Sequence, residues 1–340
     1  MDAAIARART LFEEARGEQL ALLDALFRLE RTVGLDGARR VLGEPALGDL
    51  QAAGLLREAM DAVGAQVRIV RFKGQLIASD RPGFRRHAEF VMGPGPASEL
   101  LAGAIRPPTR GRVLDLGCGP GTQGMWLASH DVEVVGLDIS ERALAFAGFN
   151  QQLNARAGTT FTLGDFLTAP PDPALDERFD MAISNPPFVL APVTDLVYRD
   201  RPLPGNGATQ TAVERVARAL APGGRGYVLG TWLDAGRGPW DATPRAWLRG
   251  LRLRGAVARV SSLSPAAYAA LWNRDLEEPQ RSIAIDAWSR GLHAEGAGRI
   301  TTAVLGFARP ARRSWRGAGS IVAIDHVRPV WSALERALAS

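Results

Sequence analysis

A nine-residue stretch at positions 113–121 constrains the fold of this chain more than any other part of it. It reads Val-Leu-Asp-Leu-Gly-Cys-Gly-Pro-Gly, so a β-branched and leucine-rich run ends in an acid and three glycines spaced two apart. A buried parallel strand turns in this way into a loop whose backbone touches a ligand, because glycine permits positive φ and close approach. The stretch predicts a nucleoside ligand.

A dinucleotide must be weighed as that ligand, because residues 119–124 satisfy G-x-G-x-x-G. Counting from the end of the strand argues against it. The first glycine is Gly117, so the third glycine of the dinucleotide pattern would fall on Thr122. Asp115 also lies in the last turn of the strand, where a carboxylate suits a ligand with an ammonium group better than a pyrophosphate.

A second predicted strand, residues 179–184, runs directly into Asn185-Pro186-Pro187-Phe188. Two successive prolines fix φ and remove two N–H groups, so this loop is stiff and presents only acceptors. It therefore suits a substrate that offers N–H bonds. Asn-Pro-Pro alone is an ordinary turn, but its position at a strand end, about 70 residues after the glycine loop, favours a functional loop.

Together the two stretches resemble the class I S-adenosylmethionine (SAM) methyltransferases, in particular those whose N-P-P-[FY] motif serves planar amino or amide nitrogens. The resemblance covers about residues 90–308. It implies a Rossmann-like α/β fold with a mainly parallel, seven-stranded sheet and helices on both faces. It also implies SAM as cofactor, S-adenosylhomocysteine as product, and no metal.

Carried over onto this sequence, the resemblance predicts the residues of the cofactor site. Asp138, at the end of the second strand, would accept the ribose hydroxyls, a role that the fold gives to an acid at this place. Asp165 would take the adenine amino group, with Phe166 close to the ring. The other predicted cofactor contacts are Asp115, Gly117, Cys118, Gly119, Gly121, Ile139 and Asn185.

The predicted catalytic residues are Asn185, Pro186 and Phe188. The Asn185 side-chain oxygen and the Pro186 carbonyl would accept the N–H groups of the substrate, and Phe188 would stack on its planar group. The predicted substrate-binding residues are Pro187, Tyr198 and Arg199. The last two belong to a loop at the carboxyl end of the sheet, whose alternative interpretation is an ordinary solvated loop.

The chain is expected to divide into four parts. Residues 1–80 form an N-terminal helical, winged-helix-like module that ends in a β-hairpin, and residues 81–111 form a linker that covers the pocket. Residues 112–310 form the methyltransferase domain, with a helical insertion at 264–297, and residues 311–340 a C-terminal extension. The N-terminal module either grips a substrate or packs as a cap on the catalytic domain.

Local patterns add further expectations. Leucine spacing predicts helices up to about residue 65, including Leu55, Leu56 and Met60. A turn at 221–224 is expected to lead into the fifth strand, and residues 256–261 and 300–307 are expected to form an antiparallel pair. The arginine run at 309–316 is expected to be a solvated face.

Composition narrows the setting but not the partner. The 41 basic residues, of which Lys73 is the only lysine, barely exceed the 36 acidic ones, so charge does not indicate nucleic acid. Cys118 is the only cysteine, and no apolar run is long enough to cross a membrane, which together predict a cytoplasmic protein without membrane association. The four histidines lack metal-ligand spacing.

The sequence thus predicts a SAM-dependent methyltransferase of a planar nitrogen in a protein or RNA. Release-factor glutamine methyltransferases and ribosomal-RNA guanine-N2 methyltransferases both resemble it. A small-molecule N- or O-methyltransferase is the first alternative. A SAM-responsive DNA-binding regulator is the second, although a sensor has no need of the intact Asn185 motif. The oligomeric state stays open.

Overall fold

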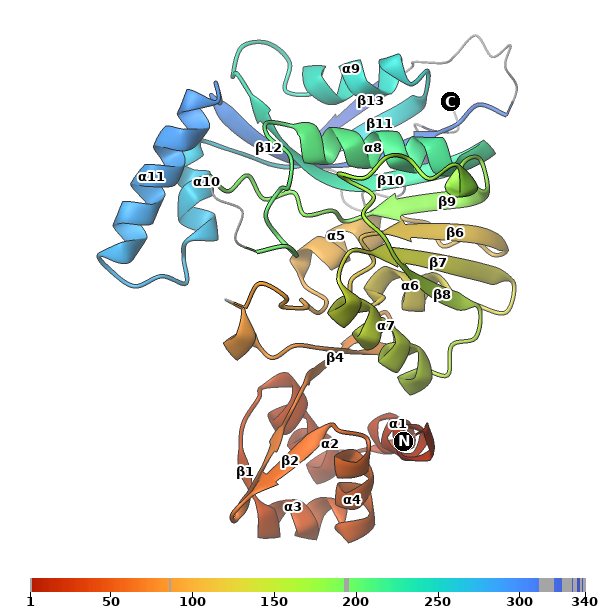
Figure 1. Ribbon diagram of the computed structural model, residues 1–340, viewed down its shortest axis with the longest axis vertical. Coiled ribbons are helices and arrows are strands. Elements are labelled where there is room, and N and C mark those ends of the chain that lie inside the picture. The colour runs from red at the N-terminus through yellow and green to blue at the C-terminus, as the bar shows by residue number, and fades with distance from the viewer. Residues whose placement is uncertain are drawn as a thin grey trace.

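A central eight-stranded sheet organises the protein (Figure 1). The computed structural model describes residues 2–85, 87–192, 196–311 and 321–325, together with 332, 335, 336 and 338. The strand order is β13-β11-β12-β10-β9-β6-β7-β8. The strands are β6 (Gly111–Leu116), β7 (Val132–Asp138), β8 (Thr159–Leu163), β9 (Phe179–Ser184), β10 (Leu220–Asp234), β11 (Arg254–Leu263), β12 (Arg299–Ala308) and β13 (Ile321–Asp325).

The strand directions confirm the Rossmann-like α/β class with one difference in strand number. β12 runs antiparallel to both neighbours, β10 and β11, and every other adjacent pair is parallel. The pairing of β11 with β12 confirms the expected antiparallel pair. The prediction of seven strands was one short, because β13 adds to β11 from a segment that carried no strand expectation.

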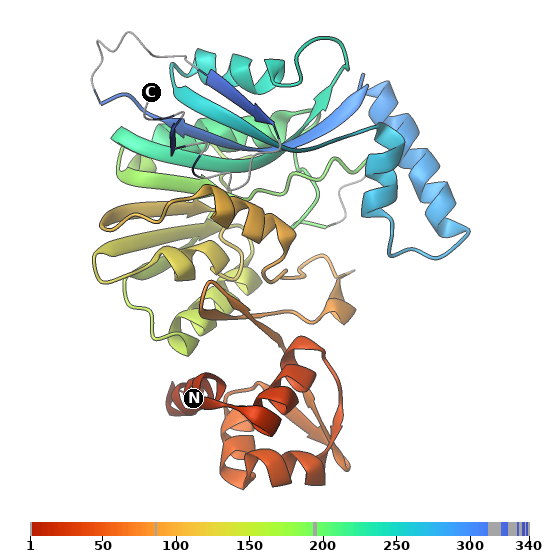
Figure 2. The same cartoon turned by 180° about the vertical axis from the view of Figure 1, so that it is seen from behind.

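Helices cover both faces of the sheet because its central strands are apolar on both sides. Leu114, Ala182 and Val228 pack on the face covered by α8 (Gly207–Ala219) and α9 (Ala242–Gly250). Val113 and Ile183 pack on the opposite face, with α5 (Pro96–Ala104) and α6 (Thr122–Leu127). Figure 1 shows α8 and α9 in front of the sheet, and Figure 2 shows the other pair from behind.

The N-terminal module is a compact unit at one end of the molecule (Figures 1 and 2). Its small sheet has the order β1-β3-β2. Its elements are α1 (Asp2–Glu14), α2 (Gly17–Leu23), the π-helical turn η1 (Asp24–Arg28), β1 (Val33–Gly34), α3 (Leu35–Leu42), α4 (Glu44–Ala52), β2 (Leu56–Ala59) and β3 (Ala62–Ala65).

Two stretches within this module depart from the helices that leucine spacing predicted. The chain leaves α4 at Ala52 and turns through Gly54, whose φ is +72°, so Leu56 begins a strand. Met60 lies in the hairpin turn between β2 and β3, with φ +54° and 95% of its surface exposed. The helical interpretation was wrong here because the pairing of β2 with β3 overrides local propensity.

The hairpin predicted at residues 66–78 is confirmed as β4 (Arg68–Phe72) and β5 (Gln75–Ser79). Its turn residues, Lys73 and Gly74, both have positive φ, as the tight turns that suit twisted strands require. After the hairpin, the short 3-10 turn η2 (Pro82–Phe84) leads towards α5.

Two asparagines join this hairpin to the large sheet domain. Asn150 lies in α7 (Glu141–Leu153), and Asn154 is the C-cap of that helix. The Asn150 side chain accepts from the Ala78 N–H at 2.8 Å and donates to the Ala78 carbonyl at 3.0 Å. Asn154 makes the same pair of bonds with Leu76, both at 2.8 Å. The two side chains therefore satisfy β5 as a neighbouring strand would.

Helices α10 (Pro265–Trp272) and α11 (Gln280–Ala294) follow β11 and precede β12 in the sequence, and they project from one side of the sheet (Figure 1). The 3-10 turn η3 (Pro173–Leu175) precedes β9. The turn expected at 221–224 is instead part of β10, which pairs with β9 through a register shift between Leu220 and Arg225. Among the helices that the structure describes, none is long and apolar enough to cross a membrane.

Candidate functional site

A cavity of about 660 Å³ opens at the carboxyl ends of the parallel strands. Its lining comes from the loops after β6, β7, β8 and β9, from the covering segment 88–93 and from residues 197–202. Ligands bind at this edge of open α/β sheets because the strand order reverses there and leaves a crevice. Every predicted cofactor contact except Gly121 lines this cavity.

The glycine loop after β6 owes its shape to backbone that only glycine adopts readily. Gly117 and Gly119 have φ of +75° and +55°, and the N–H groups of Gly117 and Cys118 both donate to the Leu137 carbonyl. Gly121 is the N-cap of α6, with φ +77°, and a Cβ there would lie 3.1 Å from the Phe161 ring. The structure therefore assigns Gly121 a packing role behind the loop.

Cys118 lines the cavity as a buried thiol. Burial raises the pKa of the Cys118 thiol, and the nearby Asp115 and Asp138 carboxylates raise it further. A Cβ on Gly136 would lie 2.9 Å from the Cys118 sulfur, so the side chain fills the space above that glycine. A thiol in this environment stays protonated and serves packing rather than nucleophilic attack.

Asp115 is a buried carboxylate whose charge is incompletely compensated. Only 2% of the residue is exposed, and its Oδ2 has no hydrogen-bond partner among the described residues. Burial raises the pKa of Asp115 to about 7, with a further contribution from the Asp138 carboxylate, while the Gly124 N–H opposes the shift. A cationic ligand group would stabilise the ionised form of this side chain.

Asp138 holds the glycine loop against the end of β7. Its Oδ2 accepts from the Gly119 N–H at 2.7 Å, and its Oδ1 accepts from the Ser140 N–H at 2.9 Å. Burial raises the pKa of this carboxylate, although these backbone bonds oppose the shift. Ile139, of which 55% is exposed, lies beside it at the cavity wall. Each carboxylate oxygen keeps a further lone pair for ligand hydroxyls.

Asp165 shapes the turn after β8 as well as lining the cavity. Its Oδ1 accepts from the backbone N–H groups of Leu167 and Thr168 at 2.8 and 2.9 Å, and its Oδ2 accepts from the Thr168 hydroxyl. Burial alone would raise the pKa of Asp165, but the Thr168 hydroxyl and the backbone N–H groups outweigh it, so the pKa is lowered. This carboxylate stays ionised at neutral pH.

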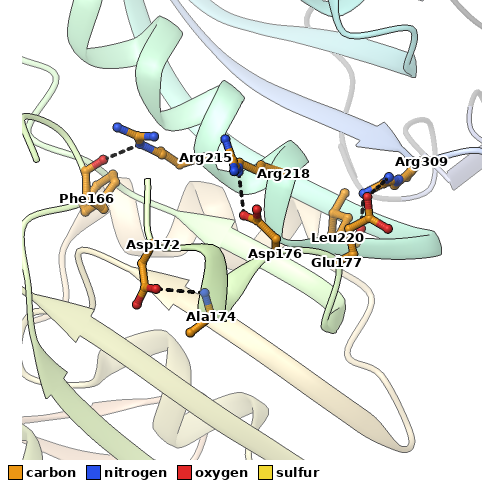
Figure 3. Close-up of polar contacts among 9 residues, drawn as sticks. All are labelled: Phe166, Asp172, Ala174, Asp176, Glu177, Arg215, Arg218, Leu220 and Arg309. Atoms are coloured by element: carbon orange, nitrogen blue, oxygen red, sulfur yellow. Dashed lines mark hydrogen bonds and ion pairs between the residues drawn. The ribbon is translucent and has the colours of Figure 1, made fainter. Parts of the chain in front are cut away.

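Arginines outside the cavity fix the segment that carries Phe166 (Figure 3). Arg215 of α8 donates to the carbonyls of Phe166 at 3.0 Å and Ala169 at 2.7 Å. Arg218 pairs with Asp176 further along the same segment. Arg215 is thus a support for the cavity wall that we did not predict, since a helical arginine carries no sequence signal for a carbonyl partner more than 40 residues earlier.

Arg309 corrects part of the expectation of a solvated arginine face. Its guanidinium pairs with Glu177 and donates to the Leu220 carbonyl at 2.9 Å, so it ties β12 to the segment before β9 (Figure 3). The other members of that run, Arg312, Arg313 and Arg316, lie outside the described residues.

The Asn-Pro-Pro-Phe loop leaves β9 beside the glycine loop. Asn185 and Pro187 line the cavity, and the Asn185 Oδ1 is buried with no partner in the part of the chain that the structure describes. Pro186 does not line the cavity. Phe188 packs against the hydrophobic core beneath the sheet, so the predicted stacking of its ring on a substrate is not supported.

The two predicted residues of the 196–203 loop separate in the structure. Tyr198 lines the cavity and meets Phe90 of the covering segment edge to face, with ring centroids 5.0 Å apart. Arg199 points elsewhere: its guanidinium lies 5.8 Å from the ring centroids of both Trp272 and Trp288. Arg199 does not line the cavity, because the Asp200 carboxylate, at 2.6 Å, and these two indole rings hold its guanidinium.

The α10–α11 pair makes further contacts with the chain that follows the Asn-Pro-Pro-Phe loop. The Tyr268 hydroxyl accepts from the Leu190 N–H at 3.1 Å, and Arg201 pairs with Glu295 at 2.5 Å. These bonds join segments almost 80 and more than 90 residues apart. The insertion thus supports the loop that carries Tyr198.

The parallel sheet with its glycine loop after β6 agrees with a sequence comparison. Residues 109–235 match the protein family described as "Methyltransferase domain". Similar proteins include two called "Ribosomal RNA small subunit methyltransferase C". The protein from Klebsiella pneumoniae is 39% identical over 93 residues, which are 27% of this chain and 25% of that protein.

The second, from Chromohalobacter salexigens, is 30% identical over 170 residues, which are 50% of this chain and 46% of that protein. The chain thus spans less than half the length of these curated relatives. Among solved structures, Haemonchus contortus phosphoethanolamine N-methyltransferase 2 with S-adenosyl-L-methionine gives a TM-score of 0.40 at 16% identity, covering 63% of this chain and 52% of that one.

Proposed function

We propose that this protein uses SAM to methylate a planar amino nitrogen in an RNA. One observation carries the nitrogen assignment. The Asn185 Oδ1 is buried without a donor from the described residues, and it lies on the same cavity as the acids of the glycine loop. A buried acceptor without a donor is unfavourable, so this position favours a substrate that supplies N–H groups.

The cofactor would lie across the strand ends. Its ammonium group would face Asp115, its ribose hydroxyls would bond to Asp138, and its adenine would lie near Asp165 and Phe166. The adenine amino group is a hydrogen-bond donor, and the ionised Asp165 carboxylate is a suitable acceptor for it. Asn185, which follows β9 next to the glycine loop, would then face the methyl group.

The chemistry asks mainly for orientation. SAM carries a sulfonium leaving group, so the S–CH₃ bond breaks as the N–CH₃ bond forms, and S-adenosylhomocysteine leaves. Correct alignment of two reactants supplies roughly 7 to 11 kcal/mol in the best intramolecular systems. Bonds from the substrate N–H groups to Asn185 favour a pyramidal nitrogen, whose lone pair is then available to attack. Asn185 is not a base, so the proton leaves to water.

Aromatic contact with the substrate falls to Tyr198 rather than to Phe188. Tyr198 lines the cavity next to Phe90, and burial raises the pKa of its phenol, so the hydroxyl remains a donor at neutral pH. A phenol ring offers a planar base an apolar face with a polar tip. The names of the ribosomal-RNA relatives support RNA over protein as the substrate class.

Labelled SAM would test the proposal with separate pools of ribosomal RNA, protein and small metabolites. We expect label in RNA, released by nuclease digestion as a nucleoside methylated on an exocyclic nitrogen. The Asn185→Ala protein, with SAM binding retained, serves as the control and should leave the RNA unlabelled. Label confined to protein or to metabolites would refute RNA as the substrate.

A further inference from the structure

We infer that Gln123 is a second ligand, beside Asp115, for the ammonium group of the cofactor's methionine moiety. This inference rests on the proposed use of SAM, and it concerns a residue that the sequence patterns did not single out. Gln123 lies in the first turn of α6, directly after the glycine loop. It lines the cavity, yet only 4% of it is exposed.

The orientation of the Gln123 amide follows from a single contact. Its Nε2 donates to the Ser98 carbonyl of α5 at 2.9 Å. A carbonyl only accepts, so this bond decides which end of the amide is nitrogen. The Oε1 is the remaining polar atom, and it is buried without a partner among the residues that the structure describes. Gln123 is therefore a fixed acceptor on the cavity wall.

Asp115 presents a second acceptor on the same cavity. The N–H of Gly124, the residue that follows Gln123, lowers the pKa of this carboxylate, and the Asp115 Oδ2 lies 3.8 Å from the position of a Cβ on Gly124. That Oδ2 also lacks a donor in the described part of the chain. Two acceptors without donors on one cavity, one of them a carboxylate, call for a ligand group with several N–H donors and a positive charge, which describes an ammonium group.

The other polar groups of the cofactor fit this pair less well. A carboxylate would repel Asp115 and would bring no donor to the Gln123 Oε1. The adenine amino group is uncharged, so it would not compensate Asp115. Gln123 also supplies what Asp115 alone lacks. Without a cation, Asp115 has a pKa of about 7, whereas an amide oxygen accepts at every physiological pH.

Calorimetry with two ligands tests this role. S-adenosylhomocysteine carries the ammonium group, and its deaminated analogue keeps the adenosine, the sulfur and the carboxylate. Gln123→Met has similar length but no acceptor, whereas Gln123→Glu keeps an acceptor. Both lose the amide donor to Ser98, so that loss is common to the two proteins.

We expect Gln123→Met to weaken S-adenosylhomocysteine about tenfold or more, as for a bond to a charged group, and the deaminated analogue less than twofold. Gln123→Glu should bind S-adenosylhomocysteine at least as well as the natural protein. Equal losses for both ligands in Gln123→Met, or the same ligand preference in both variants, would overturn the inference and leave a structural role only.

If Gln123→Met does not fold, Gln123→Glu still tests the inference. The measured quantity is then its affinity for S-adenosylhomocysteine relative to the deaminated analogue, compared with the same ratio in the natural protein. A carboxylate at position 123 that failed to favour the ligand with the ammonium group would contradict the inference. Failure of the natural protein to bind S-adenosylhomocysteine at all would instead refute the proposed function. Thermal unfolding of each variant establishes that it is folded before titration.

Discussion

The proposed cofactor side and the proposed substrate side of the cavity are built in different ways. On the cofactor side, Asp115, Asp138 and the glycine loop follow directly from strand ends, and backbone bonds within the same few loops hold them. On the substrate side, the loop that carries Tyr198 is held by side chains of α10 and α11, from far along the chain. The residues of the first side follow from local sequence, with added support from Arg215 and Asn150, whereas the second side depends on contacts that only the folded chain creates.

Asn185→Ala should produce the largest effect and should affect chemistry alone. The variant removes the acceptor that aligns the substrate nitrogen, so turnover should fall by at least about a hundredfold. Affinity for SAM should stay within a few-fold, because the cofactor acids do not bond to Asn185. Single-turnover kinetics and calorimetry measure the two quantities. Equal turnover in both proteins would reduce this loop to a turn.

Affinity for S-adenosylhomocysteine should depend on pH through Asp115. The ionised form binds the ammonium group, and the pKa of about 7 means that protons compete with the ligand below neutral pH. We expect roughly tenfold weaker binding at pH 6 than at pH 8, as for one proton displaced. Calorimetry at both values measures this, and Asp115→Asn should show a flat profile with weaker binding. A flat profile in the natural protein would contradict the assignment.

The same carboxylate gives the unliganded protein the opposite trend. Its folded pKa lies above the usual value of 3.8, so the folded state binds the proton more tightly than the unfolded state. Stability from this group is therefore present at low pH and is lost as pH rises towards 7. Thermal unfolding without ligand should follow this direction, and the trend should vanish in Asp115→Asn.

How far the sequence could predict this protein follows the same division. Asp115, Asp138 and Asp165 could be predicted to lie on one cavity, because acids at successive strand ends share one sheet edge, which alternating strand and helix patterns reveal. Phe188 and Arg199 lie outside the cavity lining, which the sequence could not show because a core cluster and two tryptophans that contact them lie far away in sequence. Gln123 and Arg215 were missed for a related reason.

Gln123 and Arg215 differ in how far their positions could be predicted from the sequence. Gln123 precedes the apolar residues Met125, Trp126 and Leu127 in α6, so an amide at the start of a buried helix is a signal that the sequence does carry. Arg215 is one of several arginines on α8 and its neighbourhood, and only the path of the 165–178 segment distinguishes it. The N-terminal leucines likewise gave no hint that β2 and β3 pair.

A matched pair of asparagines tests whether the N-terminal hairpin stabilises the cofactor side. Asn150 and Asn154 make the same two bonds to β5, but Asn150 alone also donates to the Pro120 carbonyl of the glycine loop, at 2.9 Å. Both alanine variants should lose roughly 1 to 3 kcal/mol of unfolding free energy, with the larger loss at the fully buried Asn150. Only Asn150→Ala should also weaken S-adenosylhomocysteine, by several-fold.

Denaturant unfolding and calorimetry separate these effects. If the two variants weakened the ligand equally, the bond to Pro120 would be unimportant and the hairpin would act only through general stability. Unchanged affinity in both would show that the glycine loop keeps its shape without the hairpin, which would make the cofactor side more local still.

Tyr268→Phe should have the smallest effect, confined to the substrate side. The variant removes the hydroxyl that accepts from the buried Leu190 N–H, which loosens the chain leading to Tyr198. We expect KM for RNA to rise a few-fold while affinity for S-adenosylhomocysteine stays unchanged, because the cofactor contacts lie on other strands. Ser264→Ala is the control: it removes the N-cap of the same helix, at a typical loss of about 1 kcal/mol, without touching the loop.

If both variants raised KM equally, the insertion would act through its overall stability. If only Tyr268→Phe did, the bond to Leu190 would be what connects the insertion to substrate binding, and the division between the two sides of the cavity would hold.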